Sequence, residues 1–204
     1  MKKVLTDWKL IVGFILALFC IYFSFDQPKV FWYYITGTSL LLIAYSIFNE
    51  EIDDQVSMGS YLLYGIISGL LVYGVFWIGH HLIHLLDVNT FIKQVNRLYA
   101  KFAPDVIWHF VVLILIVIPA EELFWRGFIQ KRLMKSLSVW ASIIIASVLY
   151  ASVYIFTDFP ILIIASLCAG LIWGGLYAWK RSIPLVILSH VLFDLLLFIF
   201  LPLA

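Results

Sequence analysis

Long apolar runs alternate with short polar segments along the whole chain. Each run continues for about 20 positions, which is the length that a helix needs to cross a bilayer. The sequence predicts seven such spans, at about 10–25, 30–48, 61–86, 106–130, 138–157, 160–179 and 183–202. The predicted fold class is therefore all-α, a polytopic bundle of about seven transmembrane helices in a single membrane domain over 1–204.

One segment between the spans has a different pattern. In residues 87–104 the apolar and basic positions separate around a helix: the apolar set is Phe91, Val95, Leu98 and Phe102, and the basic set is Lys93, Arg97 and Lys101. A short helix of this kind lies in the plane of the membrane surface. We expect one interfacial helix here in addition to the spans.

Composition supports a membrane protein and excludes other classes. Hydrophobic residues make up 64% of the 204 positions and charged residues 12%, against about 45–50% and about 25% in soluble domains. The net charge is only +1, and no basic stretch predicts a nucleic-acid partner. Cys20 and Cys168 lie in apolar runs without CxxC spacing, so we expect two free thiols.

The basic residues predict the orientation. With the N-terminus inside, the cytoplasmic side has eight Lys and Arg residues against four outside, Arg126 being left out as intramembrane. Positive residues gather on the cytoplasmic side of membrane proteins. We therefore expect a multi-pass protein with a cytoplasmic N-terminus.

Two adjacent carboxylates lie inside the fourth span, in the sequence PAEELFWRGF. Charged residues within a span usually mark a functional site. At about 100° per residue, Glu122 and Arg126 lie about 40° apart on the helix, whereas Glu121 lies about 140° from Arg126. Arg126 can thus neutralise Glu122, and Glu121 stays available as a general base or acid. A buried salt bridge that only fixes helix packing is the alternative.

The last span contains a second polar pair, His190 and Asp194, four residues apart and so on one face. A carboxylate beside a histidine fixes its tautomer, and such a histidine can bind a metal or polarise a carbonyl. Together with Glu121 the pair can hold a water for hydrolysis, with or without a divalent metal such as zinc. Glu121 and His190 would then be the metal ligands, although the HExxH motif of soluble zinc proteases is absent.

These motifs carry a family resemblance. Glu121-Glu122-Leu-Phe-Trp-Arg126 resembles the EExxxR motif of the CAAX-protease and bacteriocin-processing family, and His190-Val-Leu-Phe-Asp194 resembles its HxxxN/D motif. The resemblance covers about 105–200, with GLIWGG between the two motifs. It implies a multi-pass intramembrane endopeptidase, and the distribution of the family implies a bacterial plasma membrane. It also implies that Glu121 activates water, that Glu122 and Arg126 organise it, and that His190 and Asp194 complete the site.

The chain departs from the family at one motif. The family's FxxxH in the following helix corresponds here to Tyr150-Ala-Ser-Val-Tyr154, so Tyr154 replaces the histidine. From a helix turn near residue 136, Glu121 and Tyr154 differ by only about 5 Å in depth. We expect Tyr154 to face Glu121, although tyrosine is a poor base and an uncommon zinc ligand. His109 lies about 18 Å from Glu121 along the helix, so we do not expect it to replace the missing histidine. His80, His81 and His84 near the outer end of the third span stay open as replacements.

Three functions follow from these patterns. The first is an intramembrane endopeptidase that cleaves a peptide or membrane-protein substrate near the cytoplasmic leaflet of the lipid bilayer. The second is a catalytically impaired relative that binds or scaffolds a membrane-protein partner. The third is a transporter or proton relay, which the absence of a detectable inverted repeat disfavours.

Overall fold

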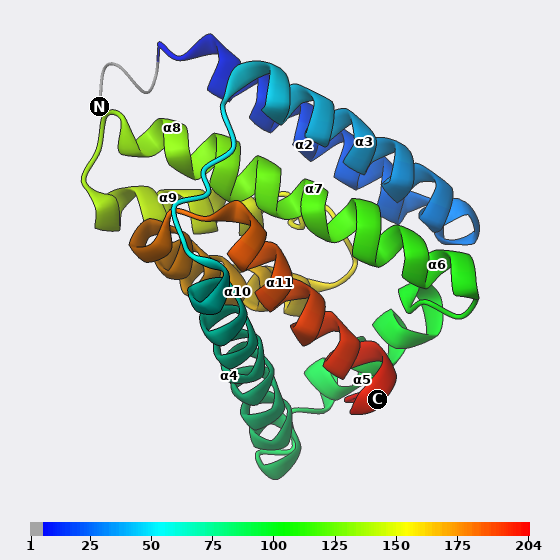
Figure 1. Cartoon of the computed structure of the whole chain (residues 1–204). Coiled ribbons are helices and arrows are strands. Elements are labelled where there is room, and N and C mark those ends of the chain that lie inside the picture. The colour runs from blue at the N-terminus through cyan, green and yellow to red at the C-terminus, as the bar shows by residue number, and fades with distance from the viewer. Residues whose placement is uncertain (1–5) are drawn as a thin grey trace.

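The computed structural model describes residues 6–204, and these form helices and connecting turns without a β-strand (Figure 1). The first half of the described chain contains α2 (Trp8–Asp26), η1 (Pro28–Val30), α3 (Phe31–Asn49), α4 (Met58–Leu85) and α5 (Asn89–Phe102). The second half contains α6 (Ile107–Val112), η2 (Leu113–Val117), α7 (Ile118–Glu122), η3 (Leu123–Gln130), α8 (Lys131–Met134), α9 (Val139–Ser152), α10 (Pro160–Lys180), α11 (Ile183–Leu195) and η4 (Leu196–Phe200).

Six helices of the described chain are long and apolar enough to cross a membrane, which confirms a polytopic bundle. They are Trp8–Asp26, Pro28–Asn49, Met58–Leu85, Ile107–Met134, Pro160–Lys180 and Ile183–Phe200. The seventh expected span, 138–157, is wrong in its last five residues. Helix α9 has 14 residues, about 21 Å, and ends at Ser152, after which turns lead to Pro160.

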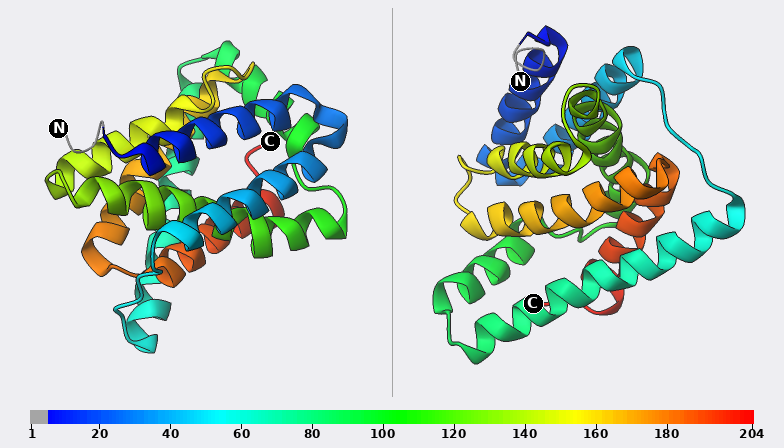
Figure 2. Two further views of the ribbon diagram at one scale, coloured as in Figure 1. Left: turned by 90° about the horizontal axis from the view of Figure 1, so that it is seen from above. Right: turned by 90° about the vertical axis from the view of Figure 1, so that its left-hand side faces the viewer.

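The long helix Ile107–Met134 forms the centre of the bundle. Residues 122–130 on it are all buried, because α3, α9, α10 and α11 pack around it. The other helices pack mainly in pairs: α2 along α3, α9 along α10, and α4 along α11 (Figures 1 and 2). The carboxylates of the expected site therefore lie in the best-packed part of the molecule.

Small residues allow the closest helix contacts. A Cβ added at Gly69 on α4 would lie 2.8 Å from the backbone oxygen of Ser189 on α11, and one at Gly170 on α10 would lie 2.9 Å from the Cβ of Ser147 on α9. Such small residues bring membrane helices close together. These contacts hold α11 against α4 and α10 against α9.

Ion pairs tie the connecting segments together at the N-terminal end of the bundle. Arg132 donates to Asp7 at 2.8 and 2.9 Å and to Glu50 at 2.7 Å. Lys131 donates to Asp53 at 2.6 Å, in the loop before α4. Burial alone would raise the pKa of Asp53, but hydrogen bonds from Lys131 and Tyr177 outweigh it and hold the pKa below its usual value.

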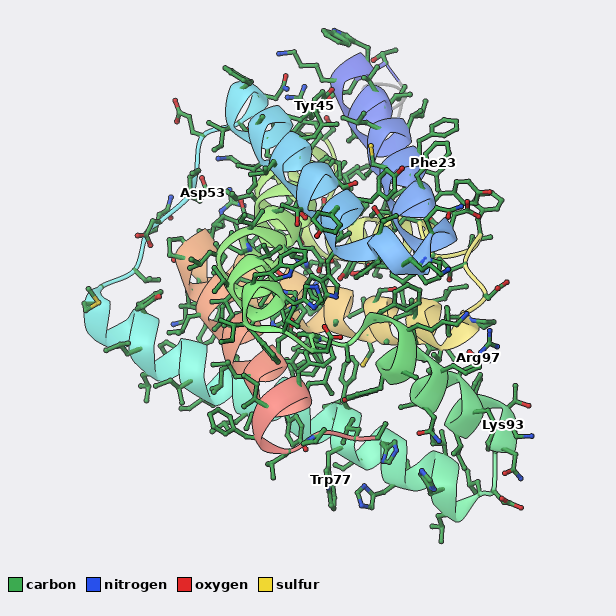
Figure 3. The ribbon with its side chains drawn as sticks, turned by 90° about the vertical axis from the view of Figure 1, so that its right-hand side faces the viewer. Phe23, Tyr45, Asp53, Trp77, Lys93 and Arg97 are labelled. Atoms are coloured by element: carbon green, nitrogen blue, oxygen red, sulfur yellow. The ribbon has the colours of Figure 1, made fainter. Side chains whose placement is uncertain are left out.

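Helix α5 covers the opposite end of the bundle. Val95, Leu98 and Phe102 face inward to a cavity, whereas Lys93 points away from the bundle (Figure 3). The hydroxyl of Tyr99 donates to the backbone oxygen of Leu197 at 2.8 Å, and burial raises the pKa of Tyr99 to about 12. The amphipathic pattern of 87–104 thus forms one helix, as expected, and that helix closes over the bundle.

Candidate active site

The two glutamates lie where the central helix departs from regular α-helix geometry. Helix α7 contains Pro119, which has no backbone N–H to donate, and π-helical turns lie on either side of it in η2 and η3. Single π-turns inside α-helices occur frequently at functional sites. The irregular backbone is buried within the bundle, where neighbouring helices can support it.

Glu122 is the centre of a buried polar cluster. Its side chain is fully buried, and its Oε1 atom accepts a hydrogen bond from Nη1 of Arg126 at 3.1 Å. The same oxygen lies 2.7 Å from Nδ1 of His190. The ion pair of Glu122 with Arg126 is confirmed. The bond from His190 was not foreseen, because it depends on how α11 crosses α7, which no spacing along the chain reveals.

Arg126 is held on several sides. Its Nη2 atom donates to the backbone oxygen of Ala169 on α10 at 3.4 Å. Its guanidinium carbon lies 5.2 Å from the ring centre of Tyr150 and 5.4 Å from that of Trp173. Aromatic faces attract a cation at such distances. The charge of Arg126 is therefore stabilised by Glu122 and by two rings, and it is not available to Glu121.

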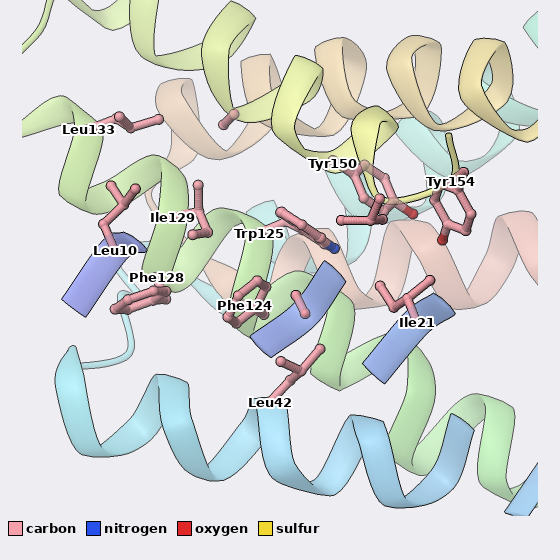
Figure 4. Packing of buried hydrophobic residues seen from close by; sticks show 13 residues of the cluster. Leu10, Ile21, Leu42, Phe124, Trp125, Phe128, Ile129, Leu133, Tyr150 and Tyr154 are labelled. Carbon is pink, nitrogen blue, oxygen red and sulfur yellow. The ribbon is translucent and has the colours of Figure 1, made fainter. Parts of the chain in front are cut away.

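Glu121 has a different partner from the one expected. The hydroxyl of Tyr150 donates to Oε2 of Glu121 at 2.8 Å. The hydrogen bond comes from Tyr150 and not from Tyr154, which lies in the turn after α9 ends at Ser152. That Tyr154 also faces Glu121 stays a prediction. The rings of Tyr150 and Tyr154 are neighbours, with centres 6.0 Å apart (Figure 4). Tyr150 stands at the aromatic position of the FxxxH motif. That this residue is Tyr and not Phe was the only feature of the sequence that pointed to its hydrogen bond with Glu121.

His190 connects the two motifs in space. Its Nδ1 atom faces Glu122, and since an ionised carboxylate only accepts hydrogen bonds, Nδ1 carries a proton. Its Nε2 atom lies 3.8 Å from Oδ2 of Asp194, one turn along α11. The two residues share a face as expected, but 3.8 Å is too long for a direct hydrogen bond. The shortest bond of His190 is to Glu122.

An apolar cavity of about 310 Å³ adjoins these residues. Aromatic side chains such as Phe25, Phe31 and Phe102 line it, and the charged or ionisable groups in its wall, apart from tyrosine, are Glu121, His190 and Asp194. An apolar cavity with a few convergent polar groups is the usual form of a ligand site. The walls come from α5, from the C-terminal segment and from the helix ends next to them, so the cavity lies in the α5 half of the bundle.

The remaining histidines lie away from this site. His109 lies 2.6 Å from Asp105 and stacks on Trp32. His80 and His84 contact each other near the end of α4, with their Nε2 atoms 3.2 Å apart. Neither group lines the cavity with Glu121, so His190 is the one histidine beside it among the described residues.

The described residues do not form a metal-binding set. Among residues 6–204 no three His, Cys, Asp or Glu side chains are grouped as the ligands of one ion would be. The Oε1 atom of Glu122 and the Nδ1 atom of His190 already bind each other. A zinc site on Glu121 and His190 would lack a third protein ligand, which structural and catalytic zinc sites normally have. We therefore derive no step through a metal.

Comparison with known proteins shows a family match in the second half of the chain. Residues 103–196 match the family described as "Type II CAAX prenyl endopeptidase Rce1-like". The matched segment contains the central helix, α9, α10 and all of α11. No curated protein and no solved structure matches the chain.

Proposed function

Since the chain belongs, over residues 103–196, to the CAAX-protease and bacteriocin-processing family of intramembrane endopeptidases, we propose that it hydrolyses peptide bonds with Glu121 as the base that activates water. The observation that carries the proposal is the position of Glu121. It is the one glutamate in the cavity wall, it has no ion-pair partner on its own helix, and His190 and Asp194 lie in the same wall.

The chemistry assigned to Glu121 needs no other base. Its carboxylate takes a proton from a water in the cavity while the water oxygen forms a bond to the substrate carbonyl carbon. The proton then passes from Glu121 to the departing amine as the C–N bond breaks, which returns Glu121 to its ionised form. A glutamate can serve in turn as base and acid in this way. Tyr150 orients the carboxylate through its 2.8 Å hydrogen bond.

His190 and Asp194 act on the other side of the reacting carbonyl in this proposal. His190 is oriented by its bond to Glu122, and its Nε2 atom, when protonated, donates to the oxyanion that forms during the attack. Donors placed in advance where charge develops give one of the largest contributions to catalysis. Asp194 stabilises the charged imidazole, and Arg126 neutralises Glu122 so that three carboxylates can share one buried site.

The cavity indicates the chemical character of the substrate. Its walls are mostly apolar, so we propose an apolar segment of a peptide or membrane protein as substrate. Such a segment would enter from the lipid bilayer.

The half of the membrane in which cleavage occurs depends on the orientation of the protein. With the N-terminus in the cytoplasm, the α5 half of the bundle lies on the outer side, so cleavage would occur in the outer half of the membrane and not near the cytoplasmic leaflet. A cysteine introduced at the exposed Asn96 on α5 tests this proposal. Labelling in intact cells by a membrane-impermeant maleimide supports it, and labelling only after lysis reverses the orientation.

A second function has one observation in its favour. Tyr150 and Tyr154 occupy the region of the motif in which the family has a histidine, so only one histidine adjoins Glu121. A site that has lost a catalytic group can keep its fold and bind a membrane-protein partner. The second proposal is therefore an impaired endopeptidase that acts as a scaffold.

The test compares wild type with Glu121→Gln and Tyr154→His in detergent, using a quenched peptide library and membrane extract. Glu51→Gln, in an exposed loop, is the matched control. Cleavage by wild type and by Glu51→Gln but not by Glu121→Gln supports the peptidase. Cleavage that persists in Glu121→Gln contradicts it. A silent wild type with Glu121-dependent cleavage in Tyr154→His supports the impaired relative.

A further inference from the structure

Trp173 is a buried residue that the chemistry described above does not use. It lies in the GLIWGG segment of α10, its side chain is 1% exposed, and it does not line the cavity. It therefore does not touch a substrate bound there.

The contacts of Trp173 are unusual for a residue that only fills space. Its ring stacks on the imidazole of His190, with centres 3.9 Å apart and planes at 28°. The guanidinium carbon of Arg126 lies 5.4 Å from the same ring. Its indole Nε1 donates to the hydroxyl of Ser189 at 3.0 Å, and that hydroxyl also accepts from Ser68 at 2.9 Å. The plane of the indole is thus fixed by hydrogen bonds on the helix that carries His190.

Both charged neighbours of Trp173 converge on one atom. His190 and Arg126 each contact the Oε1 atom of Glu122, at 2.7 and 3.1 Å. Two donors reach one oxygen only if each is held at a set angle, and Trp173 is in contact with both of them. Tyr150 is the second ring beside Arg126, but among these side chains only Trp173 stacks on His190.

We propose that Trp173 is a positioning residue that aligns His190 and Arg126 on Glu122, so that His190 presents its Nε2 atom to the cavity in one orientation. The inference rests on the proposed function of the site, since His190 is the group whose alignment matters. A smaller side chain at 173 frees the imidazole to rotate about its Cβ–Cγ bond. A misplacement of about 1 Å in an active site is able to lower the rate about 100-fold.

The experiment reads the orientation of His190 directly, without activity. Histidine-labelled protein in micelles is studied by NMR of the ring nitrogens and protons, and His190→Gln assigns the His190 signals among the five histidines. The variants are Trp173→Leu, which removes the stacking ring, and Trp173→Phe, which keeps one ring. Trp179→Leu is the matched control, because Trp179 is on the same helix, is exposed, and packs edge-to-face with Tyr64 away from the site.

Loss of the indole ring current shifts the His190 signals in Trp173→Leu by itself, so the broadening that marks a mobile ring is the result that counts. We expect the His190 signals to broaden in Trp173→Leu, to broaden less in Trp173→Phe, and to stay in place in Trp179→Leu. His190 signals that shift without broadening in folded Trp173→Leu overturn the proposal. An equal change in Trp179→Leu also overturns it, since the effect is then general. If Trp173→Leu does not fold, the same comparison is made with Trp173→Phe alone.

Cleavage kinetics of the same variants separate this inference from the proposed function. In a cleaving enzyme, we expect Trp173→Leu to lower kcat about 100-fold with KM within about twofold, and Trp173→Phe to recover most of the loss. A residue that only stabilised the fold would leave kcat of the folded fraction unchanged, and that result overturns the proposal. In a silent wild type the peptidase proposal fails, and the His190 signals still decide the role of Trp173.

Discussion

The hydrogen bond from Tyr150 to Glu121 offers a sharp test of the site. Tyr150→Phe removes the one hydroxyl that donates to Oε2 of Glu121, at 2.8 Å, and leaves the ring that packs on Trp125 and Arg126. The matched control is Tyr154→Phe, which removes a hydroxyl from the neighbouring ring, 6.0 Å away.

The expected magnitude follows from the kind of bond that is lost. A hydrogen bond to a charged group contributes about 1.5–3 kcal/mol, and about 1.4 kcal/mol corresponds to a tenfold change. If the bond orients Glu121 during the attack of water, Tyr150→Phe lowers kcat about 10- to 100-fold. Tyr150 does not line the cavity, so KM should stay within about twofold.

The assay is the initial rate of cleavage of a quenched peptide over a range of concentrations, in detergent micelles. We expect Tyr154→Phe to retain kcat within about threefold, because the hydroxyl that donates to Glu121 belongs to Tyr150 and stays in place. An unchanged kcat in Tyr150→Phe, or a larger loss in Tyr154→Phe than in Tyr150→Phe, would show that Glu121 is oriented by another group.

Two further predictions concern stability, measured as the midpoint of SDS-induced unfolding in mixed micelles. Because the pKa of Asp53 is lowered on folding, its stabilisation is present above the unfolded pKa of about 3.9 and is lost as the pH falls through the folded value. Asp53→Asn should lower the free energy of unfolding by about 1.5–3 kcal/mol at pH 7. The stability of the variant should also fall less than that of wild type below about pH 4, and an equal fall in both proteins contradicts this. Gly69→Ala should destabilise by about 1–3 kcal/mol, because its Cβ would lie 2.8 Å from the backbone of Ser189. Gly74→Ala should not destabilise the protein, because a Cβ at Gly74 would have nothing within 4 Å. Similar losses of stability in both variants would show that the effect is not steric.

The sequence by itself determined the parts of this protein that depend on local pattern. Apolar runs of span length set the helices, and the ends of six spans follow from the polar and proline residues between them. The ion pair of Glu122 with Arg126 was also visible, because residues four apart on a helix lie on one face whatever surrounds them. The family segment was visible through its two motifs.

Only the tertiary structure decided how the motifs meet. The bond of His190 to Glu122 and the hydroxyl of Tyr150 on Glu121 depend on crossing points between helices far apart in the chain. That Tyr150 donates to Glu121, and that Tyr154 lies beyond the end of α9, depended on how α9 packs and where it ends. Contacts within a helix follow from the helical period. Contacts between helices depend on packing angles and on close approaches such as that of Gly69 to α11, and the hydrophobic pattern of the sequence does not specify these.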